Sequence, residues 1–446
     1  MHLCCPSKGD RMSEGIVDLQ ELVPSAGEPI AWDDIIHSGL SPYIRAMAET
    51  PQNPVWHAEG DVLAHAKMAC ERLAESESWQ GLGRYEQEVV FLAVLLHDVG
   101  KAVVTRNENG VHVSPNHSAA GGRMVRSLLW RDFGLAGTSQ GQQFREAVCA
   151  LIENHSSPLT VYDSPEPVRK VVTLGSHGLL VPRYSNQLLC VLAEADWRGR
   201  VMSEPGEQLD RLEFFRQIAG EAGCWDRPPA LGSAYARYAY LSGRNIMPGQ
   251  DLFDNTWGTV ILMSGLPGAG KDTYIQATYP DLPVISLDEL RKQLKVSPDA
   301  SQGKVVAAAQ EQAKGYLRQK QPFIWNATNI TRSLREKQVR LFTDYGAMVR
   351  IVYLEAPWAE TLKRNRGRPD PVPESVIAKL LDKLVPPNMT EAHEIEWITV
   401  GERRLERGQR YRRDEAILAE LAARGELAYP DLDGMIASRT SFPTVD

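Results

Sequence analysis

The chain has 446 residues, of which 43% are hydrophobic and 24% charged, as expected for a globular protein of two or three domains. No apolar stretch approaches the ~18 residues that a membrane span needs, so we expect no membrane association. The net charge of −8 argues against a protein that coats nucleic acid. The six cysteines show neither CxxC spacing nor a disulfide framework, and we expect a reducing, cytoplasmic location.

The N-terminal half is predicted to be helical. Residues 1–30 lack the apolar core of a signal peptide and are expected to form a disordered extension, with Met12 as an alternative start. In residues 31–245 apolar side chains recur at helical spacing with few β-branched runs, which predicts an all-α domain. The clearest helices are expected at 62–73, 85–96, 119–129, 142–153 and 186–195.

Potential metal ligands gather around the end of the second of these helices. The sequence LAVLLHDVGK places His97 beside Asp98, with Lys101 one helical turn later. An adjacent His and Asp at a helix end offer two ligands that point into one cavity. Such a pair is common, but here further candidates lie on both sides of it. These are His57, His65, His117, His155 and Asp196. The pattern predicts a divalent metal site, with either His57 or His65 as its first ligand.

The order of a histidine, His-Asp and an aspartate resembles the HD superfamily of metal-dependent phosphohydrolases. The segments HDVGK and ADWRGR are similar to the HD domain of some tRNA nucleotidyltransferases, although the chain carries no nucleotidyltransferase signature. His117 and His155 resemble the added histidines of HD proteins that hold two metals. The resemblance implies one or two divalent metal ions, with Asp98 as the bridge where two are bound. Imidazole ligands suit Mn, Co, Ni, Fe or Zn. Lys101 and Arg200 are expected to stabilise the phosphate, or else to form structural ion pairs.

A change of pattern divides the chain. Glycine, proline and polar residues concentrate at 241–251, where we expect a linker, so that the second domain spans 246–446. Each half is long enough for a core of its own. Strand-like runs at 260–263, 283–287, 323–326 and 349–354 alternate with helix-like segments. This alternation predicts an α/β domain with a parallel sheet. A last helix is expected at 414–424.

A glycine-rich turn, GLPGAGKDT at 265–273, follows the first of these strands. Backbone amides of such a turn and the N-terminus of the following helix bind phosphates, and Lys271 would reach the β- and γ-phosphates. Asp272 replaces the usual Ser or Thr after the lysine, which leaves open how Mg²⁺ is held. The residues expected to bind ATP, or another NTP, with Mg²⁺ are Gly265, Pro267, Gly268, Gly270, Lys271, Asp272 and Thr273.

Charged residues beyond this loop suggest phosphoryl transfer. Asp288 follows the second strand, where a carboxylate can accept a proton from an attacking hydroxyl or cap a helix. Arg291, one turn later, could hold a substrate phosphate. Arg364 and Arg368 lie in a basic segment that is either a lid over the nucleotide or a solvated helix. The two arginines are four residues apart, so on a helix both would face the same way. Residues 288–383 contain 18 Lys and Arg against 11 Asp and Glu, which favours a polyanionic substrate.

These features, together with WNATNIT at 325–331, resemble the P-loop polynucleotide 5′-kinases, with Ala327 where relatives often carry an aspartate. With the HD half, the chain resembles the bacterial bifunctional end-healing enzymes, HD-Pnk. The resemblance implies phosphorylation of 5′-OH ends and hydrolysis of 2′,3′-cyclic phosphate or 2′-phosphate ends, on RNA or DNA, before a ligase joins them. A small-molecule phosphohydrolase fused to a metabolite kinase and a non-catalytic, ATP-gated RNA sensor are the alternatives. The oligomeric state is not indicated.

Overall fold

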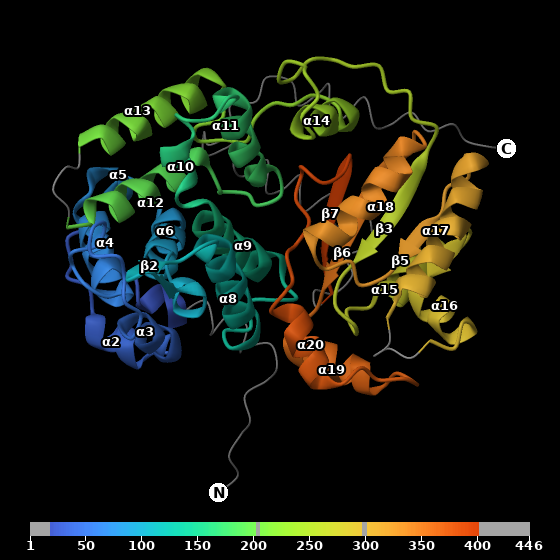
Figure 1. The fold of residues 1–446 in the computed structure, drawn as a ribbon, viewed down its shortest axis with the longest axis horizontal. Helices are drawn as coiled ribbons and strands as arrows, with labels where there is room; N and C mark the ends of the chain where they lie inside the picture. The colour runs from blue at the N-terminus through green and yellow to red at the C-terminus, as the bar shows by residue number, and fades with distance from the viewer. Residues whose placement is uncertain (1–17, 202–205, 297–300, 401–446) are drawn as a thin grey trace, which may run out of the picture. The chain divides into compact units, whose positions relative to one another are not determined.

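A computed structural model describes residues 18–201, 206–296 and 301–400 (Figure 1). The helix expected at 414–424 lies outside these residues. The described chain contains a helical half and an α/β half, as the sequence predicts. The connection between the halves, 242–258, contains neither helix nor strand, in agreement with the breakers found there. None of the described helices is long and apolar enough to cross a membrane.

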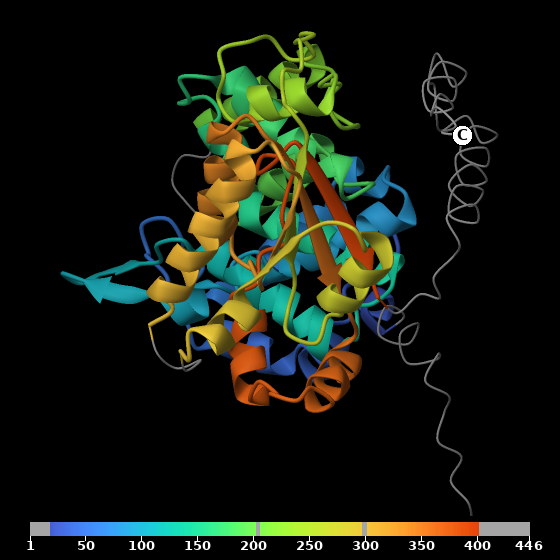
Figure 2. The same cartoon turned by 90° about the vertical axis from the view of Figure 1, so that its right-hand side faces the viewer.

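The helical half contains all five helices expected from the sequence, as α4, α6, α8, α9 and α12. It also contains a short hairpin, β1–β2, which was not predicted and projects from the helices (Figure 2). The elements are α2 (Trp32–His37), α3 (Ser41–Ala48), α4 (Val62–Glu75), α5 (Glu77–Gln80), α6 (Arg84–Leu96), α7 (Lys101–Val104), β1 (Arg106–Glu108), β2 (Val111–Val113), α8 (His117–Arg131), α9 (Ser139–Asn154), α10 (Ser157–Thr160), α11 (Pro167–Gly175), the 3₁₀ helix η1 (Ser176–Leu179), α12 (Asn186–Arg198), α13 (Gly206–Glu221) and α14 (Ala234–Leu241).

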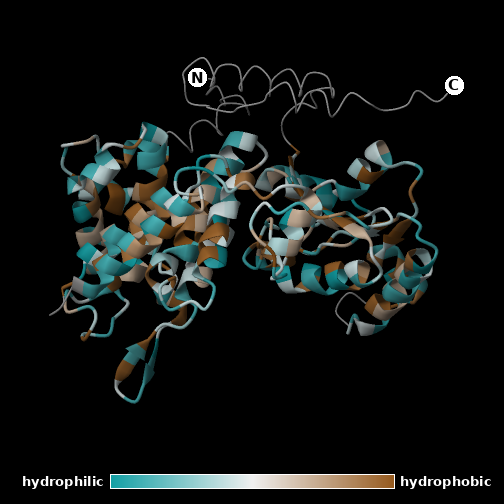
Figure 3. Ribbon diagram, turned by 90° about the horizontal axis from the view of Figure 1, so that it is seen from above, coloured by the Kyte–Doolittle hydropathy of each residue, from teal (hydrophilic) through white to brown (hydrophobic). Residues whose placement is uncertain are grey.

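Helix α6 is the centre of this half. Every residue from Gln87 to Leu96 is buried, because α4, α9 and α12 pack around it. A helix that is apolar on most of its faces needs such a position. The starts of the three surrounding helices are fixed by side-chain caps from Asp61, Thr138 and Ser185, each worth about 1 kcal/mol. Figure 3 shows the hydrophobic residues of these helices gathered toward their interior.

The N-terminal extension is shorter than predicted. Residues 18–21 are helical, and Leu19, Leu22 and Val23 are buried in the core of the helical half. Arg84 donates hydrogen bonds to the backbone carbonyls of Val23 and Pro24 and so holds the segment in place. The prediction of disorder over all of 1–30 is therefore wrong for residues 18–30, because apolar residues spaced for one helical turn dock on the core.

The α/β half is built on a five-stranded, fully parallel sheet of order β4-β5-β3-β6-β7. Four strands match the expected runs. The fifth, β7, was missed because its sequence EIEWIT mixes charged and apolar residues at a sheet edge, where most side chains are only half-buried. The elements are β3 (Thr259–Ser264), α15 (Lys271–Thr278), β4 (Val284–Ser286), α16 (Leu287–Gln293), α17 (Gly303–Arg318), β5 (Ile324–Asn326), α18 (Arg332–Asp344), β6 (Met348–Glu355), α19 (Trp358–Arg366), α20 (Glu374–Leu381) and β7 (Glu394–Thr399).

Each half has its own core, but the two halves also share a third apolar cluster. Trp130 and Ala136 of the helical half pack there with five residues of the α/β half. These five are Leu266, Ile330, Tyr353, Leu381 and Leu384. Beside this cluster the guanidinium of Arg145, fully buried, pairs with Glu355 at 2.7 Å. The linker therefore does not separate two independent bodies, and the expectation of autonomous halves must be revised.

Candidate metal centre and nucleotide site

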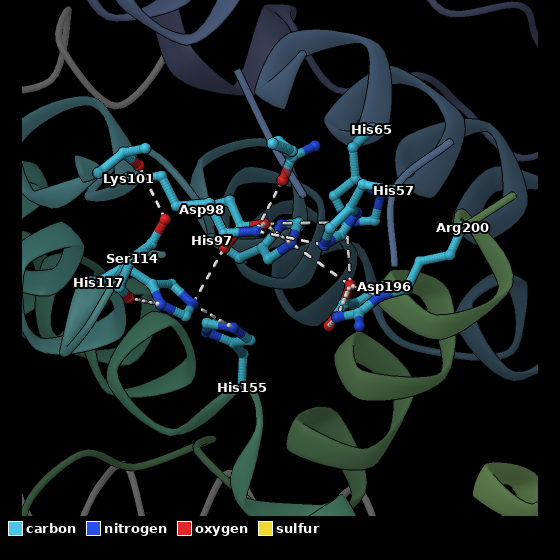
Figure 4. A network of polar contacts seen from close by, with 12 residues as sticks. His57, His65, His97, Asp98, Lys101, Ser114, His117, His155, Asp196 and Arg200 are labelled. Atoms are coloured by element: carbon cyan, nitrogen blue, oxygen red, sulfur yellow. Dashed lines mark hydrogen bonds and ion pairs between the residues drawn. The ribbon is translucent and has the colours of Figure 1, made fainter. Parts of the chain in front are cut away.

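Ends of helices carry the predicted metal ligands of the helical half into one buried pocket (Figure 4). Three histidines are fixed in the same way. His97, His117 and His155 each donate from Nδ1 to the backbone carbonyl three residues earlier, at 2.7–2.8 Å. Such a bond sets the tautomer and leaves Nε2 as the free lone pair. The helix termini thus present imidazole nitrogens that are ready to bind a cation.

One group of ligand atoms lies around His65 and His97. Nε2 of His65 is 3.0 Å from Asp196 Oδ1, and Nε2 of His97 is 3.6 Å from the same oxygen. Asp98 Oδ2 lies 3.3 Å from His97 Nε2 and 4.0 Å from His65 Nε2. Two imidazoles and two carboxylates therefore face one point, a donor set that suits a divalent transition metal.

A second group lies on the other side of Asp98. Its Oδ1 is 3.2 Å from His117 Nε2, which is 3.4 Å from His155 Nε2. The two oxygens of Asp98 thus face different histidine sets, as the sequence predicts for a carboxylate that bridges two ions. Nε2 of His97 is buried without a hydrogen bond among the described residues, and the two oxygens of Asp98 face only the ammonium group of Lys101 and histidine nitrogens, as ion pairs. Buried polar atoms of this kind fit bound metal.

The electrostatics of the pocket also fit a cation. Burial alone would raise the pKa of Asp98, but Lys101, His97 and His117 outweigh burial and hold this pKa well below its usual range. Burial alone would lower the pKa of His97, but Asp98 and Asp196 raise it to about 10, so that a bound metal ion would take the place of the proton on Nε2. Two ionised carboxylates therefore attract positive charge to the place where the histidine nitrogens converge.

The two cations predicted to act on a phosphate both lie on ligand carboxylates. Nζ of Lys101 is 2.7 Å from Asp98 Oδ2, and Arg200 donates to both oxygens of Asp196 at 2.9 Å. Arg200 also lines a cavity of about 730 Å³. Three other arginines, Arg72, Arg198 and Arg216, and three glutamates, Glu75, Glu77 and Glu194, line the same cavity. The structure thus supports the ion-pair interpretation for both side chains.

His57 and His65 differ in their surroundings. His65 belongs to the group of Asp98 and Asp196, whereas His57 Nε2 faces Lys101 Nζ at 3.4 Å. Two residues near them were missed by sequence reasoning. Gln52 accepts from Lys101 Nζ at 2.7 Å, and Glu59 contacts both histidines. The spacing His-x-Glu was a visible signal for Glu59, whereas nothing in the sequence marked Gln52.

The phosphate loop has the geometry that its glycines predict. Gly265, Gly268 and Gly270 have φ angles of 144°, 83° and 99°, a region that other residues rarely adopt. A Cβ on Gly265 would collide with the carbonyl oxygen of Leu354, and one on Gly268 would collide with that of Thr361. Helix α15 begins at Lys271, directly after the loop. The backbone amides and the helix N-terminus therefore face one concave turn.

Lys271 lies back on the loop, where its Nζ donates to the carbonyls of Gly265 and Leu266 at 2.9 and 3.0 Å. Burial lowers its pKa to about 8. The next residue, Asp272, accepts a hydrogen bond of 2.7 Å from Nδ2 of Asn326 at the end of β5. The side chain that replaces the usual hydroxyl is thus tied to the neighbouring strand.

Asp288 lies between two predicted arginines. It accepts from Arg291 at 2.5 Å and from Arg368 at 3.1 Å. Burial alone would raise the pKa of Asp288, but the two arginines outweigh burial and hold this pKa below its usual value. The helix cap at this position is Ser286, whose Oγ accepts from the backbone N–H of Glu289, so the alternative of Asp288 as the cap is wrong. Asp288 is thus an ionised carboxylate beside the nucleotide loop.

The basic segment after β6 approaches the same site. Arg364, on α19, lies close to Gly270 of the loop and pairs with Glu360 at 2.9 Å. Helix α19 ends at Arg366, so Arg368 is not on it. The expectation that Arg364 and Arg368 share one helical face is wrong, because Gly367 ends the helix between them. Arg364 nevertheless lies at the glycine-rich loop, and Arg368 lies at Asp288.

Family models match both halves of the chain. Residues 61–198 match the HD domain and residues 260–387 match an AAA domain. The protein therefore combines an HD domain, which implies binding of divalent metal, with a kinase-like P-loop domain, which implies binding of nucleotide.

Among characterised proteins, the chain is similar to two multifunctional CCA proteins. That of Tolumonas auensis is 31% identical over 189 residues, 40% of this chain and 41% of the relative. That of Hahella chejuensis is 36% identical over 92 residues, 21% of this chain and 19% of the relative. This confirms the predicted similarity to the HD domain of tRNA nucleotidyltransferases, although the chain spans less than half of either relative. A solved structure of a “putative kinase” from Chloroflexus aurantiacus is 16% identical and covers 37% of this chain and 98% of its own, but a TM-score of 0.29 is too low to establish a shared fold.

Proposed function

We propose that the protein heals broken nucleic-acid ends: its P-loop domain phosphorylates 5′-OH ends, and its HD domain hydrolyses 2′,3′-cyclic phosphate or 2′-phosphate ends. The observation that carries this proposal is the pairing of two phosphate chemistries in one chain. Strand breakage by a 2′-OH group leaves those two kinds of end. Asp98 between two histidine sets suits hydrolysis, and Asp288 beside the nucleotide loop suits phosphoryl transfer.

In the HD site, His65, His97, Asp98 and Asp196 would hold one divalent transition metal, and Asp98, His117 and His155 would hold a second. Bound metal supplies an activated water at neutral pH and charge for the phosphate oxygens. Lys101 and Arg200 hold the carboxylates in place and present cationic groups beside the position of the phosphate. Gln52 keeps Lys101 oriented toward Asp98.

In the kinase site, the loop amides and Lys271 would bind the phosphates of ATP, with Mg²⁺ as its partner ion. Asp288 would accept the proton of the attacking 5′-hydroxyl, for which its lowered pKa keeps it ionised. Arg291 would release Asp288 and hold the phosphate next to the accepting end, while Arg364 and Arg368 neutralise the transferring group. Asp272, hydrogen-bonded to Asn326, stands where the usual hydroxyl would be and would help to hold Mg²⁺.

Two features support a polynucleotide substrate over a small metabolite. The segment 288–383 carries the surplus of basic residues noted above. Immediately before His57, Val55 and Trp56 are 71% and 53% exposed. Large apolar side chains that lie open beside a catalytic pocket offer a surface on which a nucleobase can stack.

The first test separates the two activities at the kinase site. Lys271→Ala and Asp288→Ala should each abolish transfer from labelled ATP to a 5′-OH oligonucleotide and leave hydrolysis of a cyclic-phosphate oligonucleotide unchanged. Arg227→Ala, which removes an exposed cation outside the basic segment 288–383, serves as the control. Wild-type labelling by both site variants would contradict the assignment, and phosphorylation of free metabolites in place of oligonucleotides would favour the metabolite-kinase alternative.

The second test concerns the exposed tryptophan. Trp56→Ala should raise KM for a cyclic-phosphate oligonucleotide roughly 5- to 150-fold, the equivalent of the ~1–3 kcal/mol that base stacking contributes. Trp56→Phe, which retains an aromatic face, should lose much less. Hydrolysis of bis(p-nitrophenyl) phosphate, which has no base, should be nearly unchanged. Equal loss on both substrates would mean that Trp56 has a structural role.

A further inference from the structure

Glu59 lies at the centre of the contacts around His57 and His65, although its carboxyl group faces neither predicted metal position. Its side chain is 2% exposed. Oε1 accepts a hydrogen bond of 2.8 Å from His57 Nδ1 and lies 2.9 Å from His65 Nδ1, at an angle short of a good hydrogen bond. Oε2 accepts from the backbone N–H of Val201 at 3.1 Å. A buried carboxylate that accepts from two N–H groups and lies against a third ring nitrogen has a defined structural purpose.

We propose that Glu59 is a positioning residue that gives the two histidines different roles: His65 binds metal through Nε2, and His57 lines the substrate pocket beside Lys101. The proposal rests on the metal centre of the proposed function, but not on the identity of the substrate.

The argument for His65 follows from its two ring nitrogens. Nε2 of His65 faces Asp196 at 3.0 Å and Asp98 at 4.0 Å, so this nitrogen belongs to the metal position. A neutral imidazole that donates a lone pair from Nε2 must carry its proton on Nδ1. The only acidic oxygen that the described residues place beside Nδ1 is Oε1 of Glu59. A carboxylate partner of this kind fixes the ring and strengthens the metal ligand.

The argument for His57 follows from where its other nitrogen points. Its Nδ1 also donates to Glu59, so Nε2 carries a lone pair, and that nitrogen lies 3.4 Å from Lys101 Nζ. His57 does not belong to the ligand groups that include Asp98. An imidazole held in this tautomer accepts from Lys101, and it can turn the ammonium group toward a substrate oxygen when Lys101 leaves Asp98.

His57, Glu59 and His65 could instead be a metal site of their own, because their ligand atoms lie within 4.8 Å of one another. That arrangement would need Nδ1 of His65 for one ion and Nε2 for another, which requires loss of both ring protons. The position of Glu59 favours the interpretation in which it orients the two histidines and binds no metal itself. Ala58 N donates to Val201 O at 3.3 Å and Glu59 accepts from Val201 N, so this loop is tied to the segment that follows Asp196 and Arg200.

The test measures metal binding directly. Apo-protein is titrated with Co²⁺, and the absorption of the bound ion is followed in the absence of substrate. Glu59→Gln should weaken Co²⁺ binding about 10- to 100-fold, because a neutral amide strengthens the His65 ligand less than a carboxylate does, and its NH₂ group must face either the backbone N–H of Val201 or the two Nδ1 atoms. Glu71→Gln, the same change at an exposed position of the helix that carries His65, should bind Co²⁺ like the wild type. An unchanged affinity in Glu59→Gln would overturn the proposal.

The second arm separates the two histidines. His65→Gln should lose Co²⁺ from the position of His97 and Asp196, whereas His57→Gln should retain wild-type affinity within about twofold at both metal positions and lower kcat for hydrolysis. Equal loss of Co²⁺ in both variants would show that His57 is a ligand and overturn the proposal. This contrast decides the question even if Glu59→Gln does not fold. Because no nucleic acid is present in the titration, a failure of the end-healing function would leave its result intact.

Discussion

The double substitution His97→Ala, Asp98→Ala is expected to reduce cyclic-phosphate hydrolysis to background and to leave 5′-phosphorylation within about twofold of the wild type. Asp98 belongs to both groups of ligand atoms and His97 to one of them, so removal of the two side chains dismantles the whole centre. The loss should exceed the roughly 10- to 100-fold typical of changes outside the ligands themselves. Rates on the two oligonucleotide substrates, measured on the same preparation, provide the test.

The kinase site should be spared because it shares no side chain with the metal centre. Contacts between the two halves run instead through Trp130, Arg145 and Ser127, which lie elsewhere on α8 and α9. His37→Ala, a change of an exposed histidine of the same half, is the matched control. Chelation should reproduce the loss of hydrolysis, and Mn, Co, Ni, Fe or Zn should restore it. A correctly folded double variant that has lost both activities would show that the sites depend on each other.

The sequence predicted those parts of the sites that depend on local spacing. His97 and Asp98 are neighbours at a helix end, and the loop at 265–273 follows a strand, so the backbone alone brings their functional groups together. The order of the strands beyond the loop also placed Asp288 correctly. These features need only the periodicity of helices and strands and the conformational freedom of glycine.

Features that depend on contacts between distant segments could not be predicted from local spacing. Gln52 reaches Lys101 across 49 positions, and Arg145 reaches Glu355 across 210. Neither pair follows a spacing rule, since folding of several elements must first bring them together. The choice between His57 and His65 was open for the same reason, because the contact that distinguishes them, between His65 and Asp196, joins residues 131 positions apart. Arg368 shows a smaller error, in which one glycine ended a helix earlier than its charge pattern indicated.

The buried pair between the halves leads to the second large effect. The guanidinium of Arg145 pairs with Glu355 and with Glu146, stacks on Trp130 at 4.4 Å and donates to the carbonyl of Leu135. Glu355 ends β6, next to Leu354, whose carbonyl lies against Gly265 of the nucleotide loop. Leu266 of that loop packs in the same cluster as Trp130. The helical half therefore packs against the nucleotide loop and against the end of the strand that contacts it.

Arg145→Ala should lower the free energy of unfolding by about 3–5 kcal/mol, since it leaves Glu355 buried without its partner. Denaturant unfolding followed by circular dichroism measures this change, and Arg72→Ala, which removes an exposed ion pair, should cost less than about 1 kcal/mol. The double variant Arg145→Met, Glu355→Leu should recover most of the stability, because apolar side chains can replace a buried pair as a unit.

A fragment of residues 246–446 should be unstable and lose 5′-phosphorylation, because loss of the helical half exposes Leu266, Tyr353 and Glu355 together. A stable, fully active fragment, with Arg145→Ala as stable as the wild type, would show that the interface contributes nothing to the nucleotide site.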